Sequence, residues 1–281
     1  PIVILLLLAV GMAWLAFRNK SKKQDEVNED GAESEEDEGD IYDMLTVEPI
    51  EILISAELVS MVGDDEGLLM ERVKQFRKQF AIEMGIVLPK VRLKDEKKTK
   101  SNHYQIKIYG AKVGEGEVHT DKTLAINPGG SRNKIEGIHT KDPTYGLDAY
   151  WISNDQHKAA SQAGYTLVDP LTVLTTHFTE MMRQNSSLLL TRGETEKLIN
   201  RVREKQASLL EELIPNVLSI GDVQKVLQML LKEGVSIRNL ENILEVLVDQ
   251  GKQTRQPEVL TEAVRQQLGP LICEALANKQ G

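Results

Sequence analysis

The pattern of hydrophobic and polar positions divides the chain into four stretches. Residues 1–17 are a continuous apolar run, and residues 19–49 are dominated by acids. Between residues 50 and 168, short apolar runs alternate with polar turns, which is typical of strands and short helices. From Asp169 onward, apolar residues recur every three or four positions, as on amphipathic helices. We therefore predict an α+β protein with one transmembrane helix, an acidic disordered linker, small α/β subdomains and a helical subdomain.

The opening run, PIVILLLLAVGMAWLAF, contains no charged residue. As a helix it spans about 26 Å, slightly less than the roughly 30 Å hydrocarbon core of a bilayer, and we interpret the chain as a piece of a longer protein. The cations Arg18, Lys20, Lys22 and Lys23 follow at once, as at the cytoplasmic end of a membrane helix. We expect everything after about residue 18 to lie in the cytoplasm. The alternatives are a buried core helix and a signal peptide, although the run lacks the basic start and the cleavage site of a signal peptide.

The segment from residue 19 to 49 combines many acids with few apolar residues. Such a composition does not bury enough surface to offset its conformational entropy, so we predict a disordered tether. Its last part, EGDIYDMLTVEP, places Ile41 and Tyr42 among acids. This arrangement is typical of a short segment that folds on a partner surface, with solvation alone as the alternative for the acidic run.

The next stretch predicts a small α+β unit with an antiparallel sheet. Residues 50–62, IEILISAELVSMV, resemble a strand, and a helix follows with Asp64 or Asp65 as its cap and Gly85 as its stop. Residues 103–109 alternate as in a half-buried strand, and two more strand-like pieces follow, AKVGEGEVH and TLAINPGG. The expected buried residues are Leu69, Val73, Phe76 and Phe80 in the helix and Tyr104, Ile106 and Ile108 in the strand.

The C-terminal stretch predicts a compact helical bundle. Asp169 caps a helix with Pro170 at its first position, and Thr191 with Glu194 has the spacing of a capping box. Two segments, SIGDVQKVLQMLLKEG and SIRNLENILEVLVDQG, each begin at Ser and end at Gly, and a last helix is interrupted at a Gly-Pro pair (269–270). A DNA-reading helix-turn-helix is the alternative for two consecutive helices, but their acidic faces argue against it.

Charge and cysteine content narrow the functional classes. The net charge is -9 and the pI is about 5.2, which argues against nucleic-acid binding because phosphate neutralisation needs a basic face. The single cysteine, Cys273, has no internal disulfide partner. It fits a reducing compartment and excludes a CxxC redox or zinc site.

Catalytic and ligand-binding motifs are missing from the sequence. There is no GxxxxGK[ST] phosphate loop and no GxSxG nucleophile. The five histidines show no HxxxH spacing, so a metal site has little support. The GEG at 114–116 is better explained by a bend or bulge, and NPGGSRNK (127–134) by a surface turn, with an anion cradle as the alternative. We therefore expect no cofactor, no metal and no enzymatic activity, and a protein that acts by binding.

Five segments occur in one order along the chain: LAINPGG, KDPTYGLDAYWI, GYTLVDPLTVLTTH, RGETEKLI and VLSIGDVQKVLQMLLKEGVSIRNLENILEVL. Together they resemble the FlhA family, the large export-gate proteins of bacterial type III secretion. The resemblance runs from about residue 1 to 275. It implies that residues 1–18 are the last transmembrane helix of a bacterial inner-membrane protein.

The resemblance also implies a division of the chain into subdomains. The second subdomain is inserted into the first, and a fourth would follow the chain. The implied parts are a flexible linker (19–49), a first cytoplasmic α/β subdomain (50–120 with 170–189), a second small subdomain (121–169), a helical third subdomain (190–269) and the start of the connection to the fourth (270–281).

The function implied by the resemblance is that of an export-gate component in flagellum assembly. Its cytoplasmic region would dock export chaperones with their bound substrates and take part in substrate switching. Further implied partners are export-apparatus membrane proteins, components of the ATPase complex and other copies of the chain in a nine-membered ring. The alternatives are a virulence injectisome homologue with the same architecture, and a membrane-tethered sensor that binds a small ligand in a closed apolar pocket.

The resemblance implies that chaperones dock on a hydrophobic dimple lined by Asp142, Tyr145 and Thr176. The family commonly has phenylalanine where this chain has Tyr145. We predict that KDPTY is an exposed corner, in which Pro143 fixes a turn and holds the acid outward, whereas the following AYWI is a buried strand. The linker of a neighbouring subunit is implied to use the same dimple, through Glu38, Ile41 and Asp43.

Overall fold

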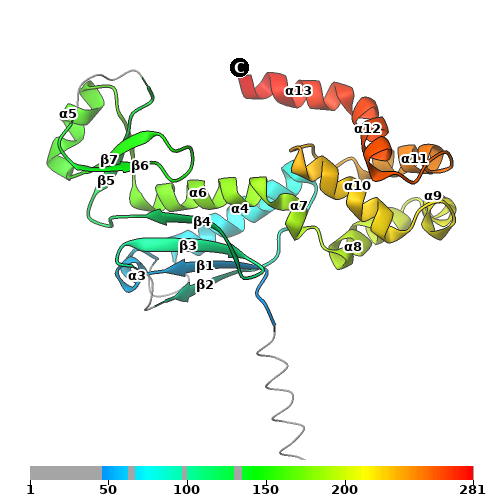
Figure 1. Cartoon of the computed structure of the whole chain (residues 1–281), viewed down its shortest axis with the longest axis horizontal. Helices are drawn as coiled ribbons and strands as arrows, with labels where there is room; N and C mark the ends of the chain where they lie inside the picture. Colours follow the sequence, from blue (N-terminus) through cyan, green and yellow to red (C-terminus); the bar gives the residue numbers. More distant parts are fainter. Residues whose placement is uncertain (1–45, 63–66, 97–99, 130–134, 281) are drawn as a thin grey trace, which may run out of the picture. The chain divides into compact units, whose positions relative to one another are not determined.

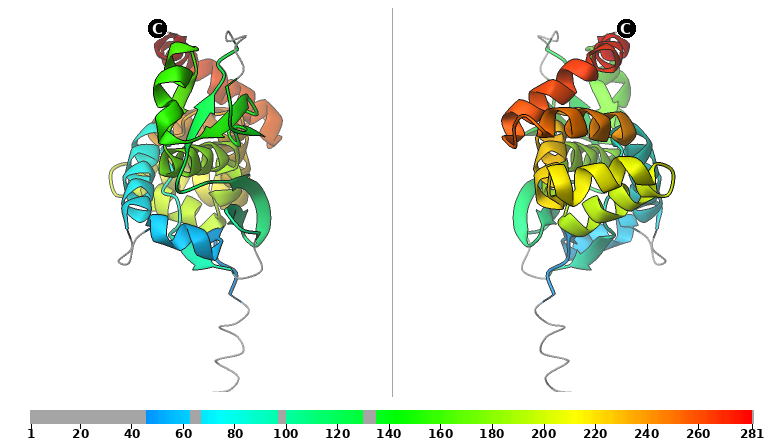
Figure 2. Two further views of the ribbon diagram at one scale, coloured as in Figure 1. Left: turned by 90° about the vertical axis from the view of Figure 1, so that its left-hand side faces the viewer. Right: turned by 90° about the vertical axis from the view of Figure 1, so that its right-hand side faces the viewer.

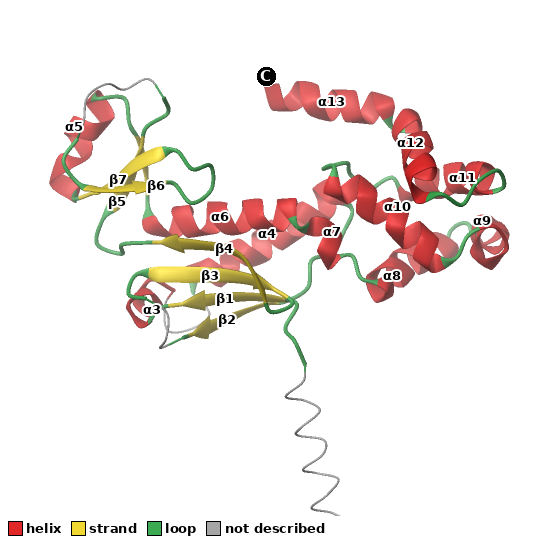
Figure 3. Cartoon of the chain, viewed as in Figure 1, coloured by secondary structure: helices red, strands yellow, loops and turns green. Residues whose placement is uncertain are grey.

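The computed structural model describes residues 46–62, 67–96, 100–129 and 135–280, and its compact unit begins at Glu48. The predicted membrane helix and most of the linker, with Glu38, Ile41 and Asp43, lie outside the described residues. None of the described helices combines the length and hydrophobicity that a membrane crossing requires. The architecture is α+β, as predicted, with two small sheets and a series of helices (Figure 1, Figure 3).

The first sheet is mixed, so the prediction of an antiparallel sheet was wrong for one pair of strands. β1 pairs parallel with β2 and antiparallel with β3, which pairs antiparallel with β4. The parallel pair follows from a helical crossover between β1 and β2, since a parallel neighbour needs a long connection. The strands, in the spatial order β2-β1-β3-β4, are β1 (Ile50–Ile54), β2 (Val91–Asp95), β3 (His103–Ile108) and β4 (Ala111–Glu117).

The strand predicted over residues 50–62 ends early. β1 stops at Ile54, and α3 (Ala56–Val62) follows as a short helix. The second crossover helix, α4 (Leu68–Met84), begins after Gly67, which makes no side-chain cap, while the predicted caps Asp64 and Asp65 lie outside the described residues. The predicted stop is confirmed, because Gly85 adopts the left-handed conformation (φ 78°) that glycine tolerates.

The helices α4 and α6 (Pro170–Gln184) lie side by side and cover one face of the first sheet (Figure 1 and Figure 2). Alternate residues of β3 point into this core, as predicted. The predicted face of α4 is confirmed, although Phe76 is only partly buried and packs edge-on against Phe178, with 5.9 Å between ring centroids. The shared core includes Leu69, Val73 and Phe80 from α4, Tyr104, Ile106 and Ile108 from β3, and Phe178 from α6.

The second sheet is small and wholly antiparallel, in the order β6-β7-β5-β8. The buried AYWI strand is confirmed, with Trp151 and Ile152 each 1% exposed, whereas Tyr150 is only half-buried. A 3-10 turn, η1 (Asn154–Gln156), and α5 (His157–Gln162) connect β7 to β8. The strands are β5 (Thr123–Ile126), β6 (Ile138–Lys141), β7 (Asp148–Ile152) and β8 (Thr166–Val168).

The remainder of the described chain is helical, and its caps follow the sequence closely. The side chains of Asp169, Thr191 and Ser219 each accept an N–H at the start of their helices. One predicted start was wrong, because α11 begins at Leu240 and not at Ser236. The elements are α7 (Ser186–Leu189), α8 (Arg192–Arg203), α9 (Ala207–Glu212), η2 (Leu213–Val217), α10 (Ile220–Lys232), α11 (Leu240–Gly251), α12 (Pro257–Gln267) and α13 (Gly269–Gln280).

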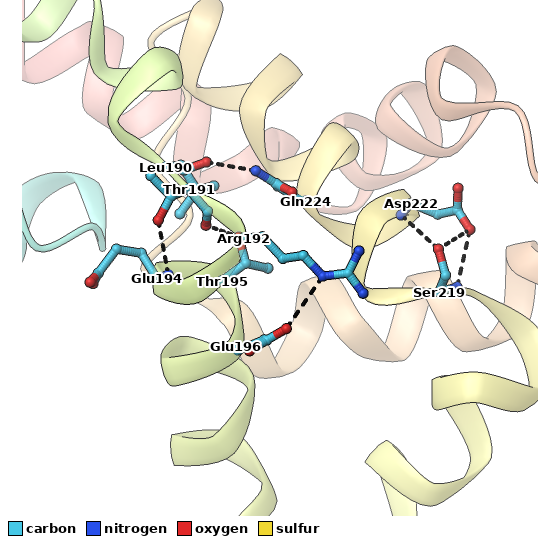
Figure 4. A network of polar contacts seen from close by, with 9 residues as sticks. All are labelled: Leu190, Thr191, Arg192, Glu194, Thr195, Glu196, Ser219, Asp222 and Gln224. Atoms are coloured by element: carbon cyan, nitrogen blue, oxygen red, sulfur yellow. Dashed lines mark hydrogen bonds and ion pairs between the residues drawn. The ribbon is translucent and has the colours of Figure 1, made fainter. Parts of the chain in front are cut away.

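Side-chain hydrogen bonds hold the start of the helical part. The carbonyl of Leu190 accepts from the side-chain amide of Gln224 on α10 (2.9 Å, Figure 4). It also accepts from the side-chain amide of Gln228, one turn further along α10 (3.0 Å). Ser236, the predicted cap of α11, instead donates to the Glu83 carbonyl (2.6 Å) at the end of α4. The next residue belongs to the same joint, since the Ile237 amide donates to the Met84 carbonyl. The bonds of Ser236 and Ile237 therefore tie the helical part to the end of α4 in the α/β part.

Candidate functional site

The connection from β6 to β7 is a closed turn held by Asp142. One carboxylate oxygen of Asp142 accepts the backbone N–H groups of Thr144 (3.2 Å) and Tyr145 (2.7 Å). The backbone closes the turn as well, because the Asp142 amide donates to Leu147 and the Gly146 amide donates to Asp142. Asp142 is only 5% exposed. The prediction that this acid points outward was therefore wrong: its carboxylate turns inward because it satisfies two backbone amides there.

Tyr145 is the side chain that the turn presents to solvent. It is 68% exposed, the highest fraction among the large hydrophobic side chains that the structure describes, and Leu147 in the same turn is 41% exposed. Single exposed hydrophobic residues are common on protein surfaces. Here, however, the ring is carried by a turn whose backbone is already held by hydrogen bonds. Binding of a partner to this ring therefore loses little backbone conformational entropy. The turn is suited to act as a binding anchor.

Thr176, the third predicted site residue, is exposed on α6. The next residue, His177, is buried and lies within electrostatic reach of Asp142. The structure thus places Asp142 and Tyr145 in one turn. Thr176 itself lies on α6, and it is the next residue, His177, that feels the charge of Asp142. Sequence reasoning had not identified His177 or its contact Tyr104 as site residues, and had predicted only that Tyr104 is buried.

A buried polar pair lies under the turn. Tyr104 from β3 and His177 from α6 are 0% and 3% exposed, and 2.7 Å separates the Tyr104 hydroxyl oxygen from His177 Nδ1. Burial lowers the pKa of His177 below its ordinary value, and the charge of Asp142 opposes that shift. Burial, with a contribution from Asp142, raises the pKa of Tyr104 far above its usual range. At neutral pH a neutral phenol therefore meets a neutral imidazole beside a carboxylate.

The cleft beside Asp142 is charged. It has a volume of about 630 Å³ and runs between the strands β3 and β4 and the residues around the turn. This lining differs from the hydrophobic dimple that the family resemblance implied and from the closed apolar pocket of a ligand sensor. The apolar surface at this place belongs to Tyr145 and Leu147. The charged side chains that line the cleft include Lys100, Lys107, Lys141, Glu115, Glu117 and Asp142.

The glycine-rich motifs have structural explanations where they are described. The GEG at 114–116 belongs to β4, and the ladder between β3 and β4 shifts register between Ile106 and Lys107, so the predicted bulge is confirmed. In the NPGG motif the side chain of Asn127 accepts the Gly129 amide, while residues 130–134 lie outside the described residues. Within the described ranges, no group of three or more His, Cys, Asp or Glu side chains is placed to hold a metal ion.

Comparison with known sequences places the whole chain in one family model. The FHIPEP family model matches residues 1–281. The flagellar biosynthesis protein FlhA of Bacillus subtilis is 41% identical over 99% of this chain, which corresponds to 43% of that protein. FlhA of Borreliella burgdorferi is 35% identical over 83% of this chain and 34% of its own length. The chain thus spans less than half the length of the curated relatives that it matches.

Solved structures with the same fold come from type III secretion proteins. The CdsV protein of Chlamydia pneumoniae superposes with a TM-score of 0.69 at 19% identity and covers 81% of this chain and 67% of its own. A complex of that protein with CdsO gives a TM-score of 0.64 at 20% identity, over 78% of this chain and 65% of its own. The nonameric EscV cytosolic domain gives 0.58 at 21% identity, over 78% and 63%. At these identities the likeness shows the fold alone.

Proposed function

This chain belongs to the FHIPEP family, and from that membership we propose that it is the C-terminal part of a flagellar export-gate protein. The support for the flagellar branch is the name FlhA that its relatives carry at 41% and 35% identity. The injectisome proteins with the same fold are more distant, at 19–21% identity. The role in flagellar protein secretion is that of whole proteins such as these relatives, of which this chain spans less than half.

We propose that the turn at residues 142–147 docks export chaperones with their bound substrates. The observation that carries this proposal is the exposed Tyr145 ring on a turn fixed by the buried Asp142 carboxylate. Asp142 then acts by holding the turn, and Tyr145 makes the contact. Thr176 borders the docking surface from α6. Docking at this turn is the step through which the region would take part in substrate switching.

The remaining features of the proposal come from the family. Two proposed features fall on residues outside the described ranges: the resemblance implies that residues 1–18 are the last membrane helix, and that the linker uses Glu38, Ile41 and Asp43 to bind the docking surface of a neighbouring copy. The first, second and third subdomains have the limits given above. A nine-membered ring and contacts with other parts of the secretion apparatus are supported by the nonameric EscV domain and by the complex of CdsV with CdsO. The region acts by binding and not by catalysis.

The first test is a titration of the chain with a flagellar export chaperone loaded with its substrate. Replacing Tyr145 by Ala removes an exposed anchor, and we expect the dissociation constant to rise about tenfold or more, as for interface hot spots, with little change in thermal stability. A matched control is Ile82→Ala, which removes an apolar side chain that is 54% exposed on α4. Equal affinity of the wild type and the Tyr145 variant would exclude this turn as the docking surface.

A further inference from the structure

The docking turn rests on groups that come from three separate segments. Asp142 belongs to the turn itself, Tyr104 to β3 and His177 to α6. The Tyr104 hydroxyl and His177 Nδ1 are 2.7 Å apart, and the charge of Asp142 acts on both side chains. Asp142 in turn accepts the amides of Thr144 and Tyr145. The buried pair therefore acts electrostatically on the carboxylate that holds the turn of Tyr145, and Tyr104 and Asp142 line the same cleft.

The backbone of strand β4 lies close to the buried pair of Tyr104 and His177. A Cβ atom on Gly116 would lie 2.5 Å from the Tyr104 hydroxyl oxygen, and one on Gly114 would lie 3.0 Å from His177 Cε1. Both glycines thus allow the strand backbone to approach the pair directly. The two rings also meet edge to face, with 5.7 Å between their centroids and 68° between their planes. The β4 backbone therefore packs directly against both members of the pair.

We propose that the Tyr104–His177 pair is the positioning device of the docking turn. The phenol donates its proton to Nδ1, which fixes the histidine as the tautomer that carries its hydrogen on Nε2. The carboxylate of Asp142 then faces a neutral ring, and its lone pairs stay available for the Thr144 and Tyr145 amides. A cationic ring at this place would compete with those amides for the carboxylate. This inference rests on the proposed function, since it explains how the docking anchor is held.

The smallest change that tests the proposal is Tyr104→Phe, which removes one hydroxyl and keeps the ring. We expect a dissociation constant for the loaded chaperone three to ten times that of the wild type. The amide resonances of Thr144 and Tyr145, in the full chain labelled with ¹⁵N-threonine and ¹⁵N-tyrosine, should shift, because their acceptor moves. Tyr165→Phe is a matched control, since it removes a hydroxyl from another buried tyrosine, which packs in the core of the second sheet. It should leave both amides and the affinity unchanged.

A second pair of variants distinguishes a positioning role of His177 from a role in core packing alone. His177→Asn keeps an acceptor near the position of Nδ1, whereas His177→Leu has none. If the pair positions the turn, the Asn variant should retain wild-type affinity to within about threefold, while the Leu variant binds at least as weakly as Tyr104→Phe. Equal losses in the two variants would show that His177 matters only as a filler of the core, and would overturn the proposal.

The outcomes separate this inference from the proposed function. If Tyr145→Ala abolishes docking and Tyr104→Phe changes neither the amides nor the affinity, the positioning role is wrong and the docking role stands. Shifted amides with unchanged affinity overturn the positioning role as well, because the turn would move without consequence. If the wild-type chain does not bind a loaded chaperone, the proposed function fails, and the two amide resonances alone decide whether the pair holds the turn.

Discussion

The α/β part of the chain, up to about residue 185, and the helical part after it differ in what they bury. Among the described residues, the almost fully buried titratable side chains all lie in the α/β part: Glu51, Tyr104, Asp142, Tyr165 and His177. The helical part buries only hydroxyls as polar side chains within that description: Ser186, Thr195 and Thr261. Each of these hydroxyls donates to a carbonyl three or four residues earlier.

This difference indicates that the two parts are stabilised in different ways. Apolar packing and local caps hold the helical part, so its stability depends on volume and depends little on protonation. The α/β part buries a carboxylate at the proposed docking turn, and a buried charge is tolerated only where hydrogen bonds satisfy it. A change in the helical part should therefore alter stability alone, whereas a change beside the Tyr104–His177 pair should alter docking as well.

The greatest loss of stability is expected from a cavity in the core of the helical part. Leu227 of α10 is 0% exposed, and Leu227→Ala leaves a cavity in the apolar core. We expect the free energy of unfolding to fall by about 2–5 kcal/mol, measured by urea titration, with unchanged chaperone affinity of the folded chain. The control Leu188→Ala, at a side chain that is 57% exposed, should change stability by no more than about 0.5 kcal/mol. Weakened docking by folded Leu227→Ala would show that the two parts are not separable.

A smaller effect is expected from Gly116→Ala on the α/β side. The new Cβ would meet the Tyr104 hydroxyl oxygen at 2.5 Å, so the pair must shift. We expect about 1–3 kcal/mol of destabilisation together with weaker docking, which distinguishes this variant from Leu227→Ala. Gly193→Ala is the matched control, because a Cβ there meets nothing nearer than 4.0 Å inside helix α8 and should stabilise by up to about 1 kcal/mol. Unaltered docking by Gly116→Ala would argue against a positioning role for the Tyr104–His177 pair.

Local signals in the sequence predicted much of the fold. The caps at Asp169, Thr191 and Ser219 and the stop at Gly85 depend only on neighbouring residues, and all four are confirmed. Errors arose where distant residues decide. Ser236 resembles a helix cap, but its hydroxyl bonds to Glu83, which is 153 residues away, and the helix begins later. The parallel pairing of β1 with β2 likewise depends on the path of the intervening helices.

The candidate site was only half predictable for the same reason. The exposure of Tyr145 follows from its position in a short turn, and the family resemblance indicated the residue. The inward orientation of Asp142 depends on what lies under the turn. Tyr104 and His177 meet there across 73 residues of sequence, and each on its own reads as an ordinary buried position. Alternation and helical periodicity report burial, and neither reports which buried residues touch.

A weaker effect on the free energy of unfolding is expected from pH, through the buried His177 of the α/β part. Because burial lowers the pKa of His177, the folded chain binds fewer protons at this site than the unfolded chain does. The stability that His177 contributes is therefore present above its unfolded pKa of about 6.5 and is lost as pH falls from that value through the lower folded pKa. We expect the free energy of unfolding to decrease on acidification in this window.

The contribution of His177 is isolated by comparing two variants across the same pH range. His177→Asn removes the titrating group and should show a flatter decline of unfolding free energy below about pH 6.5 than the wild type. His103→Asn, at the partly exposed start of β3, is the matched control variant. Docking affinity of the folded wild type should decline only at the lower end of this window, near the folded pKa of His177, because a protonated ring draws the Asp142 carboxylate away from the Tyr145 amide. Parallel pH profiles of the wild type and His177→Asn would show that His177 binds protons equally in the folded and unfolded chains, and would overturn the predicted pH dependence of the α/β part.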